Sequence, residues 1–258
     1  VTKAQLKELR KDMQIIFQDP YASLNPRMSI GDIIAEPLKI YKLCNSKEEQ
    51  QKKVREIMDV VGLAERTYGL YPHELDGGRR QRVGIARALI LDPKLVVCDE
   101  PVSALDVSIQ AQVLDLLDDL QLQLGLSYVF ITHDLSLMVE FCDRIGIMYA
   151  GELIEVAPSK AILTAPLHPY TKGLGNSFPP LHGPKTVLEG IPGTPLNLLE
   201  VPVGCRFQAR CGKVHDRCRQ EYTALAEIRP GQQAACHLYD SAEESLNHPI
   251  YLDKAAGC

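Results

Sequence analysis

The chain has 258 residues, of which 45% are hydrophobic and 24% charged, and its formal net charge is −5. This composition is typical of a globular protein with one large domain or two smaller ones. The mild acidic balance argues against a dedicated nucleic-acid-binding protein. The sequence contains no run of about eighteen apolar residues, so no membrane span is predicted. The first residues do not have the pattern of a secretory signal peptide.

The first part of the chain predicts one short strand and two helices. Residues 13–17 form an apolar run that predicts a strand. Residues 46–62 have apolar side chains at helical spacing, and Ser46 is in place to cap the N-terminus of that helix. Residues 78–91 predict a second helix, which begins after two glycines.

Three further strands are predicted over residues 95–98, 128–132 and 144–149, and helices over 107–124 and 135–142 separate them. Continuous apolar strands that alternate with helices are typical of sheets covered on both faces. The predicted fold class is therefore α/β, with a mostly parallel sheet.

The character of the chain changes after Pro158, because prolines recur and helical periodicity fades. We expect an α/β domain over residues 1–160, with a helical subdomain at about 20–92. A loop-rich extension is predicted over 161–240, and a weakly ordered tail over 241–258.

Two adjacent carboxylates, Asp99 and Glu100, follow the apolar run at 95–98. Ligands of open α/β sheets bind at the carboxyl ends of strands. One carboxylate there can hold Mg²⁺, and the other can polarise an attacking water. The alternative is a solvated acidic turn.

Four other features stand in a fixed order around this pair. Gly77 and Gly78 precede a helix, where backbone N–H groups can approach a phosphate. Gln18 and His133 each follow a predicted strand, and residues 103–106 read Ser-Ala-Leu-Asp. Each feature alone also fits a structural role, such as a helix-starting turn or an exposed loop residue. All five features in this order, each beside the expected strand or helix, are very unlikely to occur together by chance.

This ordered set resembles the ATP-binding subunit of an ABC transporter, and the resemblance covers about residues 10–240. It implies an ABC-type P-loop NTPase fold that uses ATP and Mg²⁺. Glu100 would be the catalytic base, His133 the switch histidine, Gln18 the Q-loop glutamine and Asp99 the Mg²⁺ ligand. The signature and D-loop motifs would contact nucleotide through the following residues: Asp76, Gly77, Gly78, Gln81 and Asp106.

Four further segments resemble one subfamily, the oligopeptide, dipeptide and nickel importers: residues 17–27, 166–171, 190–193 and 204–211. The resemblance implies an ATP hydrolase coupled to transport, peripheral at the cytoplasmic face of the cell membrane. Its partners would be a second ATP-binding subunit, two membrane permease subunits and, indirectly, an extracytoplasmic substrate-binding protein, with no nucleic acid. The imported substrate is selected by those partners, so the chain does not specify it.

One departure from the family pattern is that the chain contains no G-x-x-x-x-G-K-[ST] motif. That loop supplies the N–H cradle and the lysine for the phosphates. We expect an N-terminal truncation, and we expect the chain as given to be inactive alone. The alternative is a non-catalytic partner that lends Gly77 and Gly78 to the ATP of another subunit.

A second departure is Asp76, which stands where the family usually has serine. An ionised aspartate would repel a γ-phosphate. Either Asp76 points away and the glycine N–H groups bind the phosphate, or the nucleotide site that this motif completes is weakened.

Four of the eight cysteines are clustered near the C-terminus with the spacing C-x5-C-x6-C-x17-C: Cys205, Cys211, Cys218 and Cys236. Resemblance to relatives that carry a [4Fe–4S] cluster in this extension implies the same group here. The alternatives are zinc, with His215 or His237 nearby, or unligated thiols.

Overall fold

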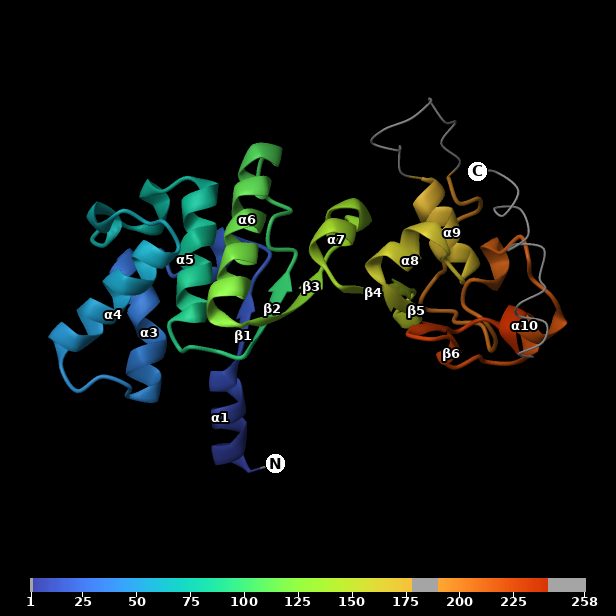
Figure 1. Cartoon of the computed structure of the whole chain (residues 1–258), viewed down its shortest axis with the longest axis horizontal. Helices are drawn as coiled ribbons and strands as arrows, with labels where there is room; N and C mark the ends of the chain where they lie inside the picture. Colours follow the sequence, from blue (N-terminus) through green and yellow to red (C-terminus); the bar gives the residue numbers. More distant parts are fainter. Residues whose placement is uncertain (1, 178–189, 241–258) are drawn as a thin grey trace. The chain divides into compact units, whose positions relative to one another are not determined.

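The computed structural model describes residues 2–177 and 190–240 of the chain (Figure 1). The chain divides into two compact units, residues 1–133 and 134–258. The predicted boundary near residue 160 stays a prediction. Within the described ranges, no helix is both long enough and apolar enough to cross a membrane.

The first unit is built on a three-stranded parallel sheet with the order β1-β2-β3. Its strands are β1 (Met13–Ile16), β2 (Leu95–Asp99) and β3 (Ser127–Ile131). The register places Ile15 beside Val97 and Val97 beside Val129. The parallel sheet confirms the predicted α/β fold class.

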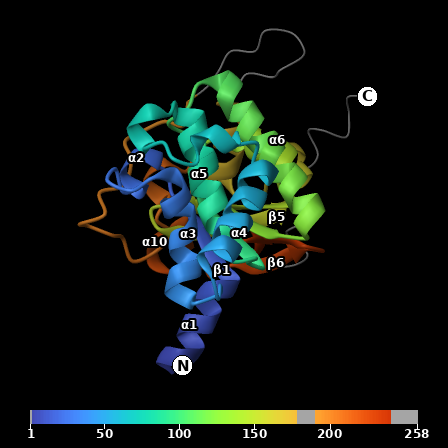
Figure 2. The same ribbon diagram turned by 90° about the vertical axis from the view of Figure 1, so that its left-hand side faces the viewer.

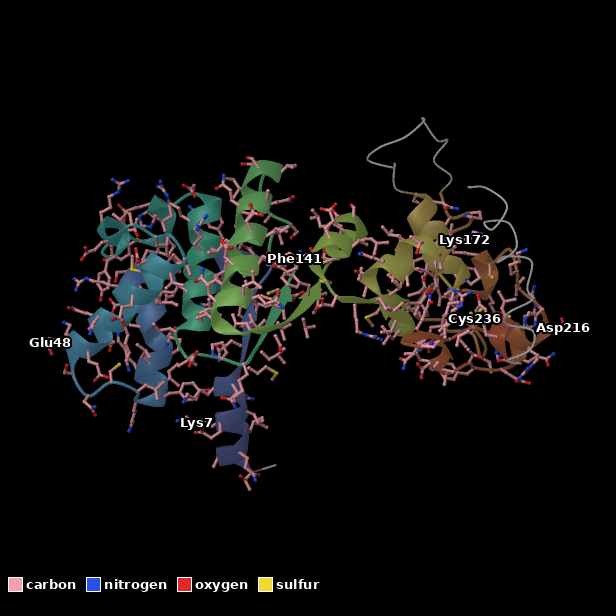
Figure 3. All side chains as sticks on the ribbon, viewed as in Figure 1. Lys7, Glu48, Phe141, Lys172, Asp216 and Cys236 are labelled. Carbon is pink, nitrogen blue, oxygen red and sulfur yellow. The ribbon has the colours of Figure 1, made fainter. Side chains whose placement is uncertain are left out.

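Six helices of the first unit are described: α1 (Lys3–Asp12), α2 (Pro20–Ser23), α3 (Ile30–Tyr41), α4 (Lys47–Val60), α5 (Gly77–Leu89) and α6 (Val107–Leu124). Helices α3, α4 and α5 pack against one another (Figure 2). Ser46 accepts a hydrogen bond of 3.1 Å from the Glu49 N–H, which confirms the predicted N-cap of α4. Helix α1, which carries Lys7 (Figure 3), has no buried residue. Lys7 Nζ lies 5.3 Å from the centre of the Tyr41 ring.

The two faces of the parallel sheet differ in burial. Ile16, Val96 and Cys98 lie on one face and are buried. The opposite face is apolar and remains largely open, with Met13, Ile15, Val129 and Ile131 between 40% and 51% exposed. Parallel sheets are ordinarily covered on both faces. An open apolar face is therefore unusual for a sheet of this kind.

The second unit contains a separate four-stranded antiparallel sheet with the order β4-β5-β7-β6. Its strands are β4 (Arg144–Tyr149), β5 (Glu152–Pro158), β6 (Ala226–Arg229) and β7 (Gln232–Ala234). The strand predicted at 144–149 therefore exists but does not join the parallel sheet. Ala150 and Gly151 both have positive φ, which permits the tight turn of an antiparallel hairpin.

Four α-helices are described in this unit: α7 (Leu135–Phe141), α8 (Ser159–Thr164), α9 (Pro169–Asn176) and α10 (Asp216–Gln220). Two short 3₁₀ turns are also described in this unit, η3 (Gln208–Arg210) and η4 (His237–Tyr239), and two in the first unit, η1 (Glu65–Thr67) and η2 (Pro72–Glu74). The extension thus holds more regular structure than proline content alone predicts. The predicted tail over 241–258 lies outside the described residues.

We predict that Gly204→Ala destabilises the second unit by about 2 kcal/mol or more. Cys205 N donates to Cys218 O at 2.8 Å, and this close approach leaves no room for a Cβ at Gly204, which would collide with the backbone at Cys218 and Arg219. The urea midpoint of the unit, measured by pulse proteolysis, tests this. Gly212→Ala is the matched control, because nothing lies within 4 Å of a Cβ there. Equal midpoints for the two variants would contradict the packing argument.

Candidate functional site

Three of the predicted site residues meet at one carboxylate. Gln18 Nε2 donates to Glu100 Oε2 at 2.7 Å, and His133 Nδ1 lies 3.3 Å from Glu100 Oε1. Glu100 is thus contacted on both of its oxygens by side chains from distant parts of the chain. The catalytic roles of these residues stay predictions, but their gathering is a feature of the fold.

The parallel sheet produces this arrangement. Gln18 follows β1, Glu100 follows β2 and His133 follows β3, so all three leave the same edge of the sheet. The Glu100 N–H donates to Ile131 O at 2.8 Å, which continues the β2–β3 pairing to the residue that carries the carboxylate.

The backbone of Glu100 is strained. Its φ is +43°, in the left-handed region that costs a non-glycine residue about 1 kcal/mol or more. Ser103 N and Ser103 Oγ both donate to Glu100 O, at 3.2 and 3.1 Å. These bonds hold the turn that directs the carboxylate toward Gln18 and His133.

Asp99 is the last residue of β2 and pairs in register with Ile131. By the alternation of the strand it lies on the same face as Val97, which is the open face of the sheet. Among the described residues, no group of three Cys, His, Asp or Glu side chains could hold a metal ion by itself. One carboxylate is nevertheless enough for Mg²⁺, which commonly takes its other ligands from phosphates and water.

The glycines of the predicted signature motif begin helix α5. An added Cβ at Gly77 would meet Leu105 at 3.2 Å, and one at Gly78 would meet Ile109 at 2.7 Å. The start of α5 therefore packs on the segment around Asp106, which is the N-cap of α6. The structure brings the predicted signature and D-loop motifs together in this way.

Asp76 is turned toward its own helix. Its Oδ1 accepts a hydrogen bond of 2.8 Å from the Arg79 N–H, and Oδ2 lies 3.5 Å from Arg79 Nε. Asp76 is thus an N-cap whose charge is paired with Arg79. No partner for Asp76 was predicted from the sequence. The arginine three residues later, Arg79, was the signal that could have predicted this ion pair.

Gln81, also predicted to contact nucleotide, is 1% exposed within α5. Its Nε2 has no hydrogen-bond partner in the described part of the chain. This burial gives no support to a direct nucleotide contact by Gln81 in the present arrangement.

Two arginines that sequence reasoning missed join α5 to the segment after Gln18. The Arg80 guanidinium lies 3.6 Å from the centre of the Tyr21 ring, and its Nε donates to Pro72 O at 2.6 Å. Arg87 Nη1 donates to Ser23 O. Arginines in an amphipathic helix usually face solvent, so no sequence signal pointed to these contacts.

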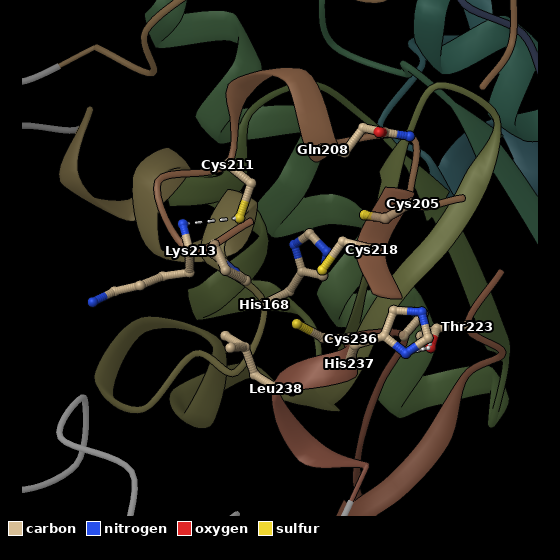
Figure 4. Close-up of a pocket in the computed structure, with 12 residues that line it drawn as sticks. His168, Cys205, Gln208, Cys211, Lys213, Cys218, Thr223, Cys236, His237 and Leu238 are labelled. Atoms are coloured by element: carbon tan, nitrogen blue, oxygen red, sulfur yellow. Dashed lines mark hydrogen bonds between the residues drawn. The ribbon is translucent and has the colours of Figure 1, made fainter. Parts of the chain in front are cut away.

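The four clustered cysteines of the second unit line one small pocket of about 20 Å³, shared with His168 and His237 (Figure 4). Their sulfurs face the same space although Cys205 and Cys236 are far apart in sequence. Lys213 N donates to Cys211 Sγ at 3.4 Å. Such backbone N–H groups are favourable partners of metal-bound sulfur.

Burial raises the pKa of the Cys205 and Cys211 thiols, and raises that of Cys236 to about 12. Without a bound cation these thiols are therefore protonated at neutral pH. Binding of a metal group would displace the protons, because the thiolate is the ligand.

The histidines named for a zinc site do not offer their nitrogens to this pocket. His237 Nδ1 lies 2.8 Å from Asp240 Oδ2, and Nε2 lies 3.0 Å from Glu221 O. His215 is exposed. The contacts of His237 therefore give no support to a zinc site that uses a histidine ligand, and no group of three or more Cys, His, Asp or Glu side chains in the described ranges could hold a metal ion.

His168, to which sequence reasoning gave no role, is 1% exposed and lines the same pocket. Burial lowers its pKa to about 4, so the imidazole is neutral at neutral pH. His168 N and Leu167 N each donate to the buried carboxylate of Glu155 at 2.8 Å.

Two family profiles match different parts of the chain. The profile of the family described as "ABC transporter" matches residues 1–103. The profile described as "Oligopeptide/dipeptide transporter, C-terminal region" matches residues 154–218. Both matches confirm the resemblance inferred from the motifs.

The chain is 47% identical over 239 residues to the oligopeptide transport ATP-binding protein OppF of Haemophilus influenzae, covering 90% of the chain and 71% of that protein. It is 46% identical over 237 residues to the di/tripeptide transport ATP-binding protein DppF of Pseudomonas aeruginosa, covering 92% of the chain and 73% of that protein.

Two solved structures share the fold. The Clostridium perfringens protein cbiO1, part of an ABC transporter complex, matches with a TM-score of 0.57 and 26% identity over 64% of each chain. The ATP-binding cassette MJ0796, bound to ADP and Pi, matches with a TM-score of 0.53 and 31% identity, covering 62% of this chain and 68% of that one.

Proposed function

We propose that this chain, which belongs to the family of ATP-binding proteins of oligopeptide and dipeptide ABC transporters, provides ATP hydrolysis for peptide import. The observation that carries the proposal is the Glu100 carboxylate, contacted by both Gln18 and His133. A base that is held on both sides can be aimed at one water. Peptide is favoured over nickel as the substrate because the relatives described above are named for peptides.

In this proposal Glu100 orients the attacking water and accepts its proton. His133 contacts the γ-phosphate and stabilises the charge that develops there. Gln18 reports the state of the site through the segment that Arg80 and Arg87 join to α5. Asp99 would hold Mg²⁺, which neutralises phosphate charge when bound.

The phosphate cradle is the part of the site that these 258 residues do not provide, since they contain no G-x-x-x-x-G-K-[ST] motif. We propose that a strand–loop–helix segment with this motif, outside the given sequence, covers the open face of the parallel sheet. Met13, Ile15, Val129 and Ile131 supply the apolar surface for such a helix. Asp99 lies on the same face, where Mg²⁺ would meet the phosphates.

In the assembled transporter, the start of α5 in one subunit would complete the ATP site of a second ATP-binding subunit. The pair would work with two membrane permease subunits, and indirectly with an extracytoplasmic substrate-binding protein. In this proposal the chain is a peripheral subunit at the cytoplasmic face of the cell membrane.

For the second unit, the proposed group is a [4Fe–4S] cluster held by Cys205, Cys211, Cys218 and Cys236. Supporting it are four sulfurs that face one pocket, and a His237 whose ring nitrogens are already engaged. When bound, such a cluster would cross-link four points of the extension and would have a structural role.

We predict that the chain alone binds Mg²⁺–ATP weakly and hydrolyses none. Joined at its N-terminus to a strand–loop–helix segment that carries a G-x-x-x-x-G-K-[ST] motif, it gains both activities, because that segment supplies the cradle. Nucleotide binding and phosphate release measure this. Glu100→Gln in the joined protein is the control, and it keeps binding but loses hydrolysis. Hydrolysis by the chain alone at the rate of the joined protein would contradict the proposal.

A second prediction concerns the Asp76–Arg79 pair. Because Arg79 compensates Asp76, Asp76→Ser and Asp76→Asn in the joined protein leave the ATPase rate within about twofold, whereas Arg79→Gln weakens ATP binding about two- to fivefold. The double variant Asp76→Ser/Arg79→Gln restores binding. Serine and asparagine both retain the N-cap, so the helix is unchanged. A several-fold gain from Asp76→Asn alone would show that the aspartate repels phosphate despite Arg79.

A third prediction is that anaerobically purified protein is brown and contains about four iron and four sulfide per chain. Cys218→Ser abolishes the visible absorbance, while Cys44→Ser, which is remote in sequence from the four, leaves it unchanged. Colourless protein with stoichiometric zinc would contradict the cluster, and so would protein without metal.

A further inference from the structure

A buried hydrogen-bond network fixes the position of His168. Glu155 is fully buried, and its carboxylate accepts hydrogen bonds from Leu167 N, His168 N and Gln232 Nε2, the last at 3.1 Å. Gln232 Nε2 also donates to Ala165 O at 3.0 Å. The backbone at His168 is therefore held from β5 and β7 at once.

The orientation of the imidazole is fixed in the same way. Its Nδ1 accepts a hydrogen bond of 3.1 Å from Tyr170 N, which makes His168 the N-cap of α9. The ring also packs against Phe207, with 5.7 Å between ring centres. Because Nδ1 is an acceptor, the ring proton must lie on Nε2.

The ring lines the cysteine pocket, and the hydrogen bond that orients it is made at Nδ1, on the side of Tyr170. In Figure 4 the imidazole of His168 points into the space bounded by Cys211, Cys218 and Cys236. A metal-bound sulfur in this pocket would be a hydrogen-bond acceptor for the Nε2–H of the ring.

We propose that His168 is a positioning residue of the four-cysteine site, and that its Nε2–H donates a hydrogen bond to a sulfur of the bound group. This inference rests on the [4Fe–4S] cluster proposed above. Hydrogen bonds to the sulfurs withdraw negative charge from a cluster and are one of the factors that set its reduction potential. His168 thus ties the potential of the group to the packing of α9 against the sheet.

The direct test is pulsed electron paramagnetic resonance of the reduced full chain, grown with isotope-labelled histidine. The expected result is a weak histidine nitrogen coupling, as from a hydrogen bond, that is lost in His168→Asn. A strong coupling typical of a direct ligand overturns the proposal, and so does the absence of coupling. This measurement on the wild-type protein does not depend on the folding of any variant.

The reduction potential gives a second readout. His168→Asn keeps an oxygen that can cap α9 but removes the Nε2–H, so the potential shifts to a lower value. His215→Asn is the matched control, because His215 is exposed and makes no side-chain cap bond at the start of α10, and its potential stays unchanged. Equal potentials for His168→Asn and wild type overturn the proposal.

The iron and sulfide content of the purified protein distinguishes failure of the cluster proposal from failure of the His168 proposal. Protein without iron and sulfide shows that there is no cluster, and the role of His168 falls with it. Protein with a full cluster but no histidine coupling leaves the cluster standing and overturns only the role of His168.

Discussion

The carboxylate of Glu100 is held where three parallel strands end at the same edge, and the organisation of the first unit depends on this constraint. Gln18 and His133 reach it because β1 and β3 flank β2 in register. The positive φ of Glu100 is a local cost that the surrounding bonds offset. Hydrolysis at this point also needs a phosphate cradle, and the open face beside Asp99 is where such an element can pack.

The second unit is organised by a different buried carboxylate. Glu155 collects three N–H donors and thereby positions His168 against the cysteine pocket. Near the same pocket, Arg206 pairs with Glu152 at 2.8 Å and donates to Ala150 O, which ties the segment beginning at Cys205 to the β4–β5 hairpin. The pocket is thus supported by the sheet as well as by its own loops, which suits a structural group.

Local signals were enough to predict several elements from the sequence. Helix α6 was predicted at 107–124 and is found there, and Ser46 caps α4 as expected. The gathering of Gln18, Glu100 and His133 follows from strand order, which motif order implies. What could not be predicted depends on tertiary contacts: the strand at 144–149 pairs antiparallel because of its turn, and the position of His168 depends on residues more than sixty positions away.

We propose above all that Glu100 is the catalytic base for ATP hydrolysis in a peptide importer. The identity of the nucleotide retained by the Glu100→Gln variant of the joined protein tests this most directly. We expect the variant, incubated with Mg²⁺–ATP and separated from free nucleotide, to retain intact ATP, whereas the wild-type protein retains ADP. Retention of ADP by the variant would contradict the claim, because hydrolysis would then proceed without the carboxylate.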